Sequence, residues 1–205
     1  MPKPIKCPND KQASKIVDYL NRECDSGSMP RLAARNRVIV LLALDAGLRV
    51  AEIAGLQRRD LWYGEAPVID LIVRVAIAKN HKERTIPLSE RLRSAIVTIH
   101  DRLWPIPLSY ADPREKTSYG AFGNITPRQI QRIAEGLSLA ACGERFHPHA
   151  FRHYFATRMM HLCDTRTLQE LLGHSSLQST QVYTHPTIQD LRNAINKTNG
   201  TCSKP

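Results

Sequence analysis

The spacing of hydrophobic positions along the chain predicts a mainly α-helical protein. On several segments, apolar residues recur every three or four positions, which gives a helix one buried face. The segments predicted as helices are 10–24, 31–46, 89–103, 127–141, 148–162, 168–172, 177–183 and 186–197. Asp164 or Thr165 provides an N-cap for the sixth of them, and Gly47 ends the second because glycine tolerates the left-handed conformation.

Two short extended segments lie among these helices. Residues 68–78 are rich in β-branched side chains, and residues 84–88 form a second extended piece. The polar residues 79–83 between them are typical of a hairpin tip, and a third small strand is expected near residues 61–63. The expected fold class is therefore mainly α with a small antiparallel β-sheet (α+β).

The chain is expected to form one domain over residues 1–205. A chain of 205 residues can build one sizeable core, and no repeat, linker or low-complexity stretch divides it. Residues 1–8 and 198–205 lie outside the predicted helices, so both ends are expected to be loosely held.

Composition and charge narrow the class of partner. The hydrophobic fraction of 42% and the charged fraction of 23% are typical of a globular protein. The 29 Lys and Arg exceed the 19 Asp and Glu and give a net charge of +10, which favours a polyanionic partner such as nucleic acid. No Lys-rich amphipathic helix with an aromatic face supports the alternative, a membrane-surface protein. No apolar run approaches a membrane span or a signal sequence, so we expect a cytoplasmic, nucleoid-associated protein.

The cysteines argue against a disulfide framework and against a zinc finger. They are odd in number, widely spread and never form C-x-x-C, which indicates a reducing compartment. A zinc site built from His149, His153, His161 and Cys163 would lack a recognised ligand spacing. No metal and no cofactor are expected.

Arg49 is unusual because it lies in an otherwise apolar segment, residues 47–56. A buried guanidinium needs an anionic partner, since an unpaired charge in the core is very costly. Glu52, three residues later, is one candidate partner, and a bound phosphate is the other. The sequence leaves both open.

The predicted helix 148–162 carries a second basic group beside a histidine. Phe151, Phe155 and Met159 recur every four positions and mark its buried face. His149 and Arg152 lie three apart, so one turn brings them to the same face. A planar guanidinium beside an imidazole suits a phosphate, although a basic amphipathic helix with solvated side chains would show the same pattern.

Taken in order, several motifs resemble the tyrosine recombinase (phage-integrase-like) family. They are Gly47-Leu48-Arg49 with Glu52, the hairpin 79–88, His149-x-x-Arg152-His153, Leu172-Gly173-His174 and Tyr183-Thr184-His185. His174 and Tyr183 are nine apart, as in that family, and the hairpin is most similar to the bacterial chromosome-dimer-resolving recombinases. Several motifs in the right order are far more specific than any one of them.

The resemblance implies the tyrosine-recombinase catalytic-domain fold and a site-specific DNA recombinase that integrates, excises or inverts a mobile element. Arg49 and Arg152 would clamp the scissile phosphate, and His149 and His174 would add hydrogen bonds. His149 would also help to move the tyrosine proton. Tyr183 would be the nucleophile that forms a 3′-phosphotyrosyl link.

The family's general acid corresponds to Lys79 at the hairpin tip. Lys82 is three residues away and remains an alternative, because hairpin register is easily misjudged. Other basic side chains are expected to contact DNA phosphates, namely Lys82, Arg84 and Arg128. His147 and His153 are expected to be structural.

The resemblance also implies partners. Double-stranded DNA is the expected substrate, with a homo-oligomer, a tetramer, formed on it through the C-terminal helix and with accessory DNA-bending proteins as further candidates. The catalytic pattern begins within the first fifty residues, so no N-terminal core-binding domain is expected, as in the small fimbrial phase-switching recombinases. Two rival functions stay open: DNA relaxation of the type IB topoisomerase kind, and a catalytically silent DNA-binding regulator.

Overall fold

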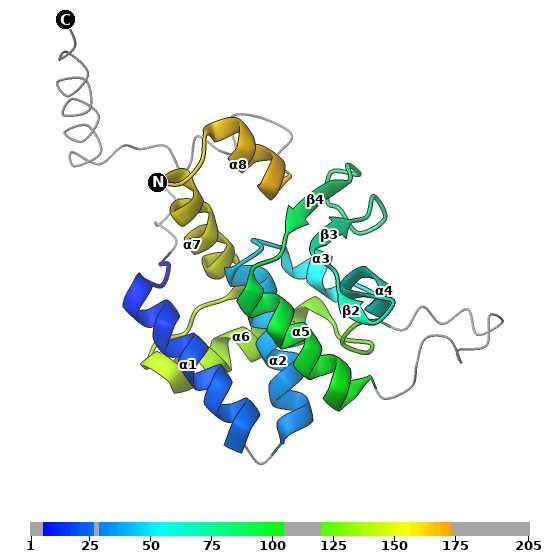
Figure 1. Cartoon of the computed structure of the whole chain (residues 1–205). Coiled ribbons are helices and arrows are strands. Elements are labelled where there is room, and N and C mark those ends of the chain that lie inside the picture. Colours follow the sequence, from blue (N-terminus) through cyan, green and yellow to red (C-terminus); the bar gives the residue numbers. More distant parts are fainter. Residues whose placement is uncertain (1–5, 27–28, 105–119, 174–205) are drawn as a thin grey trace, which may run out of the picture.

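The computed structural model describes residues 6–26, 29–104 and 120–173 of the chain (Figure 1). Within these ranges the protein is mainly helical with small antiparallel sheets, which confirms the predicted fold class. None of the described helices is both long and apolar enough to cross a membrane. The two last predicted helices, 177–183 and 186–197, lie outside the described residues, as do His174 and Tyr183.

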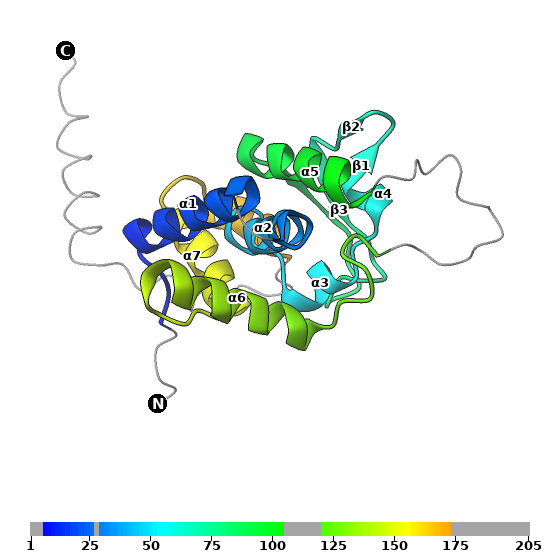
Figure 2. The same ribbon diagram turned by 90° about the horizontal axis from the view of Figure 1, so that it is seen from below.

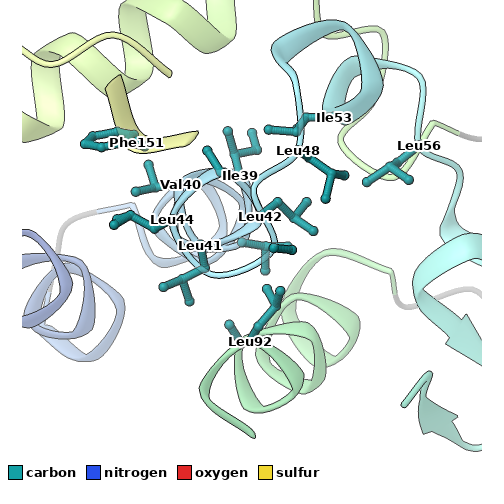
Figure 3. Packing of buried hydrophobic residues seen from close by; sticks show 14 of the residues in the cluster. Ile39, Val40, Leu41, Leu42, Leu44, Leu48, Ile53, Leu56, Leu92 and Phe151 are labelled. Carbon is teal, nitrogen blue, oxygen red and sulfur yellow. The ribbon is translucent and has the colours of Figure 1, made fainter. Parts of the chain in front are cut away.

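The core is built around α2, which spans Pro30–Leu44. Its residues 38–44 are all buried, as expected for a segment of helix in which every residue is apolar. Figure 2 looks nearly along α2 and shows the other long helices around it. In Figure 3 its side chains point outward in several directions, toward Leu48, Ile53, Leu92 and Phe151.

Four long helices surround α2, namely α1 (Asp10–Ser26), α5 (Glu90–Leu103), α6 (Pro127–Cys142) and α7 (Pro148–Met160). A shorter helix, α8 (Thr165–Leu172), follows α7 in the chain. The helix α8 packs on α7 and on the hairpin rather than on α2. Phe155 of α7 joins Leu168 and Leu172 of α8 in a small second core. The site described below lies where α7, α8 and the hairpin approach one another.

Capping residues mark several helix limits, and the predicted Asp164 is among them. The Asp164 carboxylate accepts hydrogen bonds from the backbone N–H groups at the start of α8, and the Ser89 hydroxyl accepts one at the start of α5. Thr126 and Gln129 form a capping box at the start of α6. Gly47, with φ of +62°, takes the left-handed conformation beyond the end of α2.

The strands form two separate two-stranded antiparallel sheets. The strands β1 (Trp62–Tyr63) and β2 (Ala66–Pro67) pair with each other, and β3 (Asp70–Val73) pairs with β4 (Arg84–Pro87). The extended piece expected near residues 61–63 therefore exists. It does not join the main hairpin, because its hydrogen bonds go to the strand that directly follows it.

Two short helices were not predicted, α3 (Val50–Ala54) and α4 (Arg58–Leu61). Elements of about one turn are too short to show a hydrophobic period. Each of these two helices nonetheless has a local sequence signal, an acidic residue in its first turn. The carboxylate of Glu52 accepts a 2.8 Å hydrogen bond from the backbone N–H of Arg49, and Asp60 does the same for Gln57. An acidic side chain in the first turn satisfies backbone donors that the helix leaves unpaired.

Candidate active site

Arg49 and Arg152, predicted as a phosphate clamp, meet at one backbone oxygen. The Nη2 atom of Arg152 donates to the carbonyl of Leu172 at 2.7 Å, and Nη1 of Arg49 approaches the same oxygen at 3.4 Å. Leu172 is the last residue of α8, and the last carbonyls of a helix lack intrahelical partners and carry partial negative charge. The end of α8 therefore gathers guanidinium groups from two distant parts of the chain.

Arg152 is held in place by packing as well as by hydrogen bonds. Only 2% of its surface is exposed, and its Nη1 atom donates to the carbonyl of Gly47. A Cβ atom at Gly47 would overlap the ring of Phe155, so the close approach of this loop to α7 requires glycine. Packing of Phe155 against Gly47 thus helps to fix the position of the guanidinium.

Glu52 is a fully buried carboxylate beneath this pair. Its Oε1 atom accepts hydrogen bonds from Nη1 of Arg49 at 3.1 Å and from Nη1 of Arg84 at 2.9 Å. Its Oε2 atom accepts from Nη2 of Arg84 at 2.7 Å. Burial alone would raise the pKa of Glu52, but the hydrogen bonds and charge of Arg84, with help from the Arg49 N–H and the charge of Arg152, hold it below its usual value. Glu52 is therefore an anion at neutral pH.

Glu52 thus answers the question that the sequence left open about Arg49. The Glu52 carboxylate is a partner of Arg49, but it is shared with Arg84. Its single negative charge therefore does not neutralise both guanidinium groups. Arg49 and Arg84 contact this one buried carboxylate and the charge of Arg152 also acts on it, so the described part of the site keeps a net positive charge. An anion placed at the edge of the cluster would be stabilised by that charge and by the forked guanidinium donors.

His149 lies within the same positive field. Burial lowers its pKa, and the charges of Arg152, His147, Arg49 and Lys79 lower it further. Three other predicted site residues, Arg49, Lys79 and Arg152, are thus among the charges that act on this imidazole. A neutral imidazole can accept a proton, which is what the reaction would ask of His149 at the start of cleavage.

His147 and His153 flank His149 on α7. The rings of His147 and His149 are stacked with centroids 6.2 Å apart, and the ring of His153 meets that of His149 edge-on at 5.1 Å. The Nδ1 atom of His147 accepts a hydrogen bond from the backbone N–H of Ala150 and caps α7, in line with a structural role. Burial and the neighbouring charges of His149, Arg152 and His147 lower the pKa of His153 to about 4.

Lys79 is exposed in the turn of the β3–β4 hairpin. The backbone N–H of His81 donates to the carbonyl of Ala78 at 3.0 Å and closes this turn around Lys79 and Asn80. Lys82 is also exposed and lines a pocket of about 660 Å³ between the hairpin and α8. The charge of Lys79 is among those that lower the pKa of His149.

The three predicted phosphate contacts differ in their surroundings. Lys82 and Arg128 are exposed, the latter in the first turn of α6, and can reach a ligand. Arg84 is less accessible, because its side chain is only 7% exposed and pairs with Glu52. Its Nε atom also donates to the carbonyl of Leu171 at 3.0 Å. These bonds make Arg84 an internal connection between the hairpin, Glu52 and the end of α8.

Sequence reasoning missed Asn80. Its Nδ2 atom donates to the carbonyl of Gly173 at 3.0 Å, so it joins the hairpin tip to the residue that follows α8. Nothing in the local sequence marks this contact, because its partner lies 93 residues away. Among the described residues, no group of three or more His, Cys, Asp or Glu side chains is arranged to hold a metal ion, and that includes the histidine-rich face of α7.

Comparisons with known proteins point to one family. The model of the phage integrase family matches residues 9–190. The tyrosine recombinase XerA of Pyrococcus furiosus is 34% identical over 173 residues, which is 83% of this chain and 57% of that protein. The tyrosine recombinase XerC of Mesorhizobium japonicum is 37% identical over 187 residues, 90% of this chain and 55% of that protein.

A similar fold is found among solved structures. A crystal structure of XerA recombinase matches with a TM-score of 0.71 and 22% identity, covering 97% of this chain and 65% of that one. The chain thus spans little more than half the length of the curated relatives it matches.

Proposed function

Because the chain belongs to the phage integrase family, as the family model and its tyrosine recombinase relatives show, we propose that it is a site-specific recombinase. It cleaves and rejoins DNA strands through a 3′-phosphotyrosyl intermediate. The observation that carries this proposal is the convergence of Arg49 and Arg152 on the carbonyl of Leu172, next to His149.

The arginine pair suits the reacting phosphate. A phosphodiester carries one negative charge, and negative charge on its non-bridging oxygens grows as a nucleophile adds to phosphorus. Guanidinium groups that are already fixed by Gly47, Leu172 and Glu52 need little reorganisation to bind that charge. Arg49, whose side chain is 21% exposed, is the member of the pair that solvent reaches.

The groups around Arg49 and Arg152 would carry out the proton transfers. His149, kept neutral by its surroundings, would take the proton of the attacking tyrosine. Lys79 would give a proton to the departing 5′-oxygen. Tyr183 as nucleophile and His174 as a further phosphate ligand complete the proposal, and both lie outside the described residues. His174 directly follows Gly173 in the sequence, the residue whose carbonyl is bound by Asn80.

The proposed substrate is double-stranded DNA, on which the protein would act as a tetramer in the cytoplasm, at the nucleoid, with accessory DNA-bending proteins as further partners. The net charge of +10 supports a polyanionic substrate. Exposed Lys82 and Arg128 are the proposed backbone contacts. Integration, excision or inversion of a mobile element is the proposed biological role.

A covalent trapping experiment tests the chemistry. The protein is incubated with a pool of nicked suicide duplexes that carry a randomised core, and covalently bound DNA is isolated under denaturing conditions and sequenced. Wild-type protein should form an adduct, and Tyr183→Phe should not. Tyr63→Phe removes the hydroxyl of a tyrosine that is 83% exposed on β1 and serves as the matched control, which should keep the adduct.

The same protein variants and DNA substrates also distinguish the proposed function from its two rivals. An adduct that still forms with Tyr183→Phe would show that another residue is the nucleophile. DNA binding without any adduct would favour a silent regulator. Adduct formation with relaxation of supercoiled plasmid, but without exchange between two duplexes, would favour topoisomerase activity. Light scattering on the trapped complex would show whether a tetramer forms.

A further inference from the structure

The turn that carries Lys79 rests on the end of α8. The side chain of Asn80 donates to the carbonyl of Gly173 at 3.0 Å, and Nε of Arg84 donates to the carbonyl of Leu171 at 3.0 Å. These two side chains come from opposite ends of the short segment 80–84, which follows Lys79 directly. Both bind carbonyls that a helix end leaves without intrahelical partners, where positive charge and N–H donors are favourable.

Arg84 is the stronger of the two anchors. It is the first residue of β4, opposite Val73 of β3, so its position sets where the hairpin tip begins. Its guanidinium forms two parallel bonds, of 2.9 and 2.7 Å, with a carboxylate of Glu52 that is only 1% exposed. Charge-assisted bidentate pairs of this kind are among the strongest and most directional hydrogen bonds in proteins.

The contacts of Arg84 connect three parts of the site. Glu52 also binds Arg49, and Leu171 immediately precedes Leu172, whose carbonyl is bound by Arg152. The fit is tight, since a Cβ atom at Gly173 would lie 2.9 Å from Cδ of Arg84. A displacement of Arg84 would therefore move the hairpin relative to the arginine pair.

From these contacts we infer that Arg84 is a positioning residue for Lys79, which holds the Lys79 turn against the end of α8 beside the Arg49–Arg152 pair. This inference rests on the proposed function. The side chain of Lys79 is long and exposed, and a general acid must reach one particular oxygen. Misplacement of a catalytic group by about 1 Å can reduce a rate roughly 100-fold.

The step that depends on Lys79 defines the test. The Tyr183 oxygen forms a bond to phosphorus while its proton passes to His149, and the bond from phosphorus to the 5′-oxygen breaks. The Lys79 ammonium gives its proton to that departing oxygen. When sulfur replaces the bridging 5′-oxygen, the leaving thiolate is stable without a proton, and the demand on Lys79 disappears.

The experiment compares two matched nicked suicide substrates, made from a sequence recovered by covalent trapping, with either oxygen or sulfur at the bridging position. In Arg84→Met, single-turnover cleavage of the oxygen substrate should slow by about 10- to 100-fold. Cleavage of the sulfur substrate should stay within about threefold of wild type, because the thiolate needs no general acid. Lys79→Met should show the same selectivity and gives the reference.

Two further variants keep the result interpretable. Arg84→Lys preserves the positive charge beside Glu52 but loses the forked geometry, so it should fold like wild type and still slow only the oxygen substrate. Arg91→Met removes another arginine that pairs with a carboxylate, that of Asp45 instead of Glu52, and should leave both rates unchanged. Circular dichroism and thermal melting report whether each variant folds.

The outcomes separate this inference from the proposed function. Equal slowing of the two substrates in a folded Arg84→Lys would overturn the positioning role, as would unchanged cleavage of both. If wild-type protein traps no DNA from the randomised pool, the proposed function itself fails at that earlier step and this inference fails with it.

Discussion

Arg152 and Leu172 are joined by a 2.7 Å hydrogen bond from a buried guanidinium to the last carbonyl of α8. The same guanidinium donates to the carbonyl of Gly47, so one side chain holds the end of α8 to the loop after α2. The arginine proposed to bind phosphate is therefore also a structural connection. Its removal would affect stability as well as chemistry.

Arg152→Lys should separate the role of Arg152 in cleavage from any role in DNA binding. A lysine keeps the charge but cannot donate to Gly47, Leu172 and a phosphate with one planar fork. Trapping of the covalent adduct should fall on the order of 10²- to 10³-fold. DNA affinity, measured by fluorescence anisotropy at fixed salt, should change by less than about tenfold because many other contacts supply it. Equal losses of affinity and of cleavage would show that Arg152 serves binding alone.

Glu52→Gln should destabilise the fold in a pH-dependent way. Removing one member of a buried ion pair costs on the order of 3–5 kcal/mol. The pKa of Glu52 is lowered in the folded state, mainly by Arg84 acting against burial. The carboxylate therefore contributes stability above its unfolded pKa of about 4.3, and this contribution is lost as pH falls through the lower folded value.

Urea denaturation of wild type and Glu52→Gln at several pH values between neutral and acid measures this difference. The gap between the two proteins should be largest at pH 7 and shrink below about pH 4. Glu90→Gln is the matched control, since the Glu90 carboxylate is 86% exposed and pairs with Arg93 on the surface. It should change stability by less than about 1 kcal/mol at any pH. A gap that is constant with pH would contradict an ionised Glu52.

Much of the fold was predictable because its signals are local. The apolar run of α2, the caps at Ser89, Thr126 and Asp164, and the left-handed Gly47 all depend on neighbouring residues. The separate pairing of β1 with β2 was not predicted. Strands of two residues carry almost no periodic signal.

The site was predictable in its residue types and only partly in its contacts. The sequence pattern indicated Arg49 and Arg152, and the structure brings both to Leu172. The internal contacts of Arg84 were not predicted, because Glu52 and Leu171 lie 32 and 87 residues away in the chain. Only the packing of α8 against the hairpin reveals such a contact. The roles of His174 and Tyr183 stay predictions.

Lys79→Met and Lys82→Met should differ in their response to the leaving group. With oxygen at the bridging position, Lys79→Met should slow cleavage by about 10²- to 10⁴-fold, the usual contribution of a general acid. With sulfur there, the variant should approach wild type. Lys82→Met should show similar, modest changes with both substrates through weaker DNA binding, to a degree that depends on salt. The reverse pattern would identify Lys82 as the acid.

His153→Gln should make the stability of the protein depend less strongly on pH under mildly acidic conditions. The pKa of His153 is lowered to about 4, first by burial and then by the charges of His149, Arg152 and His147. Between about pH 6.5 and pH 4 the unfolded chain binds a proton at this position and the folded protein does not. His153 therefore causes no loss of stability above about pH 6.5, and it lowers the free energy of unfolding progressively as pH falls below that value. Denaturation curves at pH 7.5, 6 and 5 should give a shallower slope for the variant, and an unchanged slope would contradict the lowered pKa.

Gly173→Ala and Gly143→Ala form a matched pair that isolates the contact with Arg84. Both glycines follow helices in the left-handed region, with φ of +61° at Gly173 and +76° at Gly143. Alanine should cost about 1–2 kcal/mol at either position through backbone strain alone. The space around them differs: a Cβ atom at Gly143 would meet nothing within 4 Å, whereas at Gly173 it would lie 2.9 Å from Cδ and 3.0 Å from Nη1 of Arg84.

Gly173→Ala should therefore cost about 1–3 kcal/mol more than Gly143→Ala, because the guanidinium must shift or the end of α8 must open. Thermal melting of both variants measures the difference in stability. Cleavage of the oxygen-bridged substrate should slow in Gly173→Ala and stay close to wild type in Gly143→Ala, since only the first displaces Arg84 from Glu52 and Leu171. If the two variants lost equal stability and kept equal activity, the close packing of Arg84 on Gly173 would have no consequence for the site.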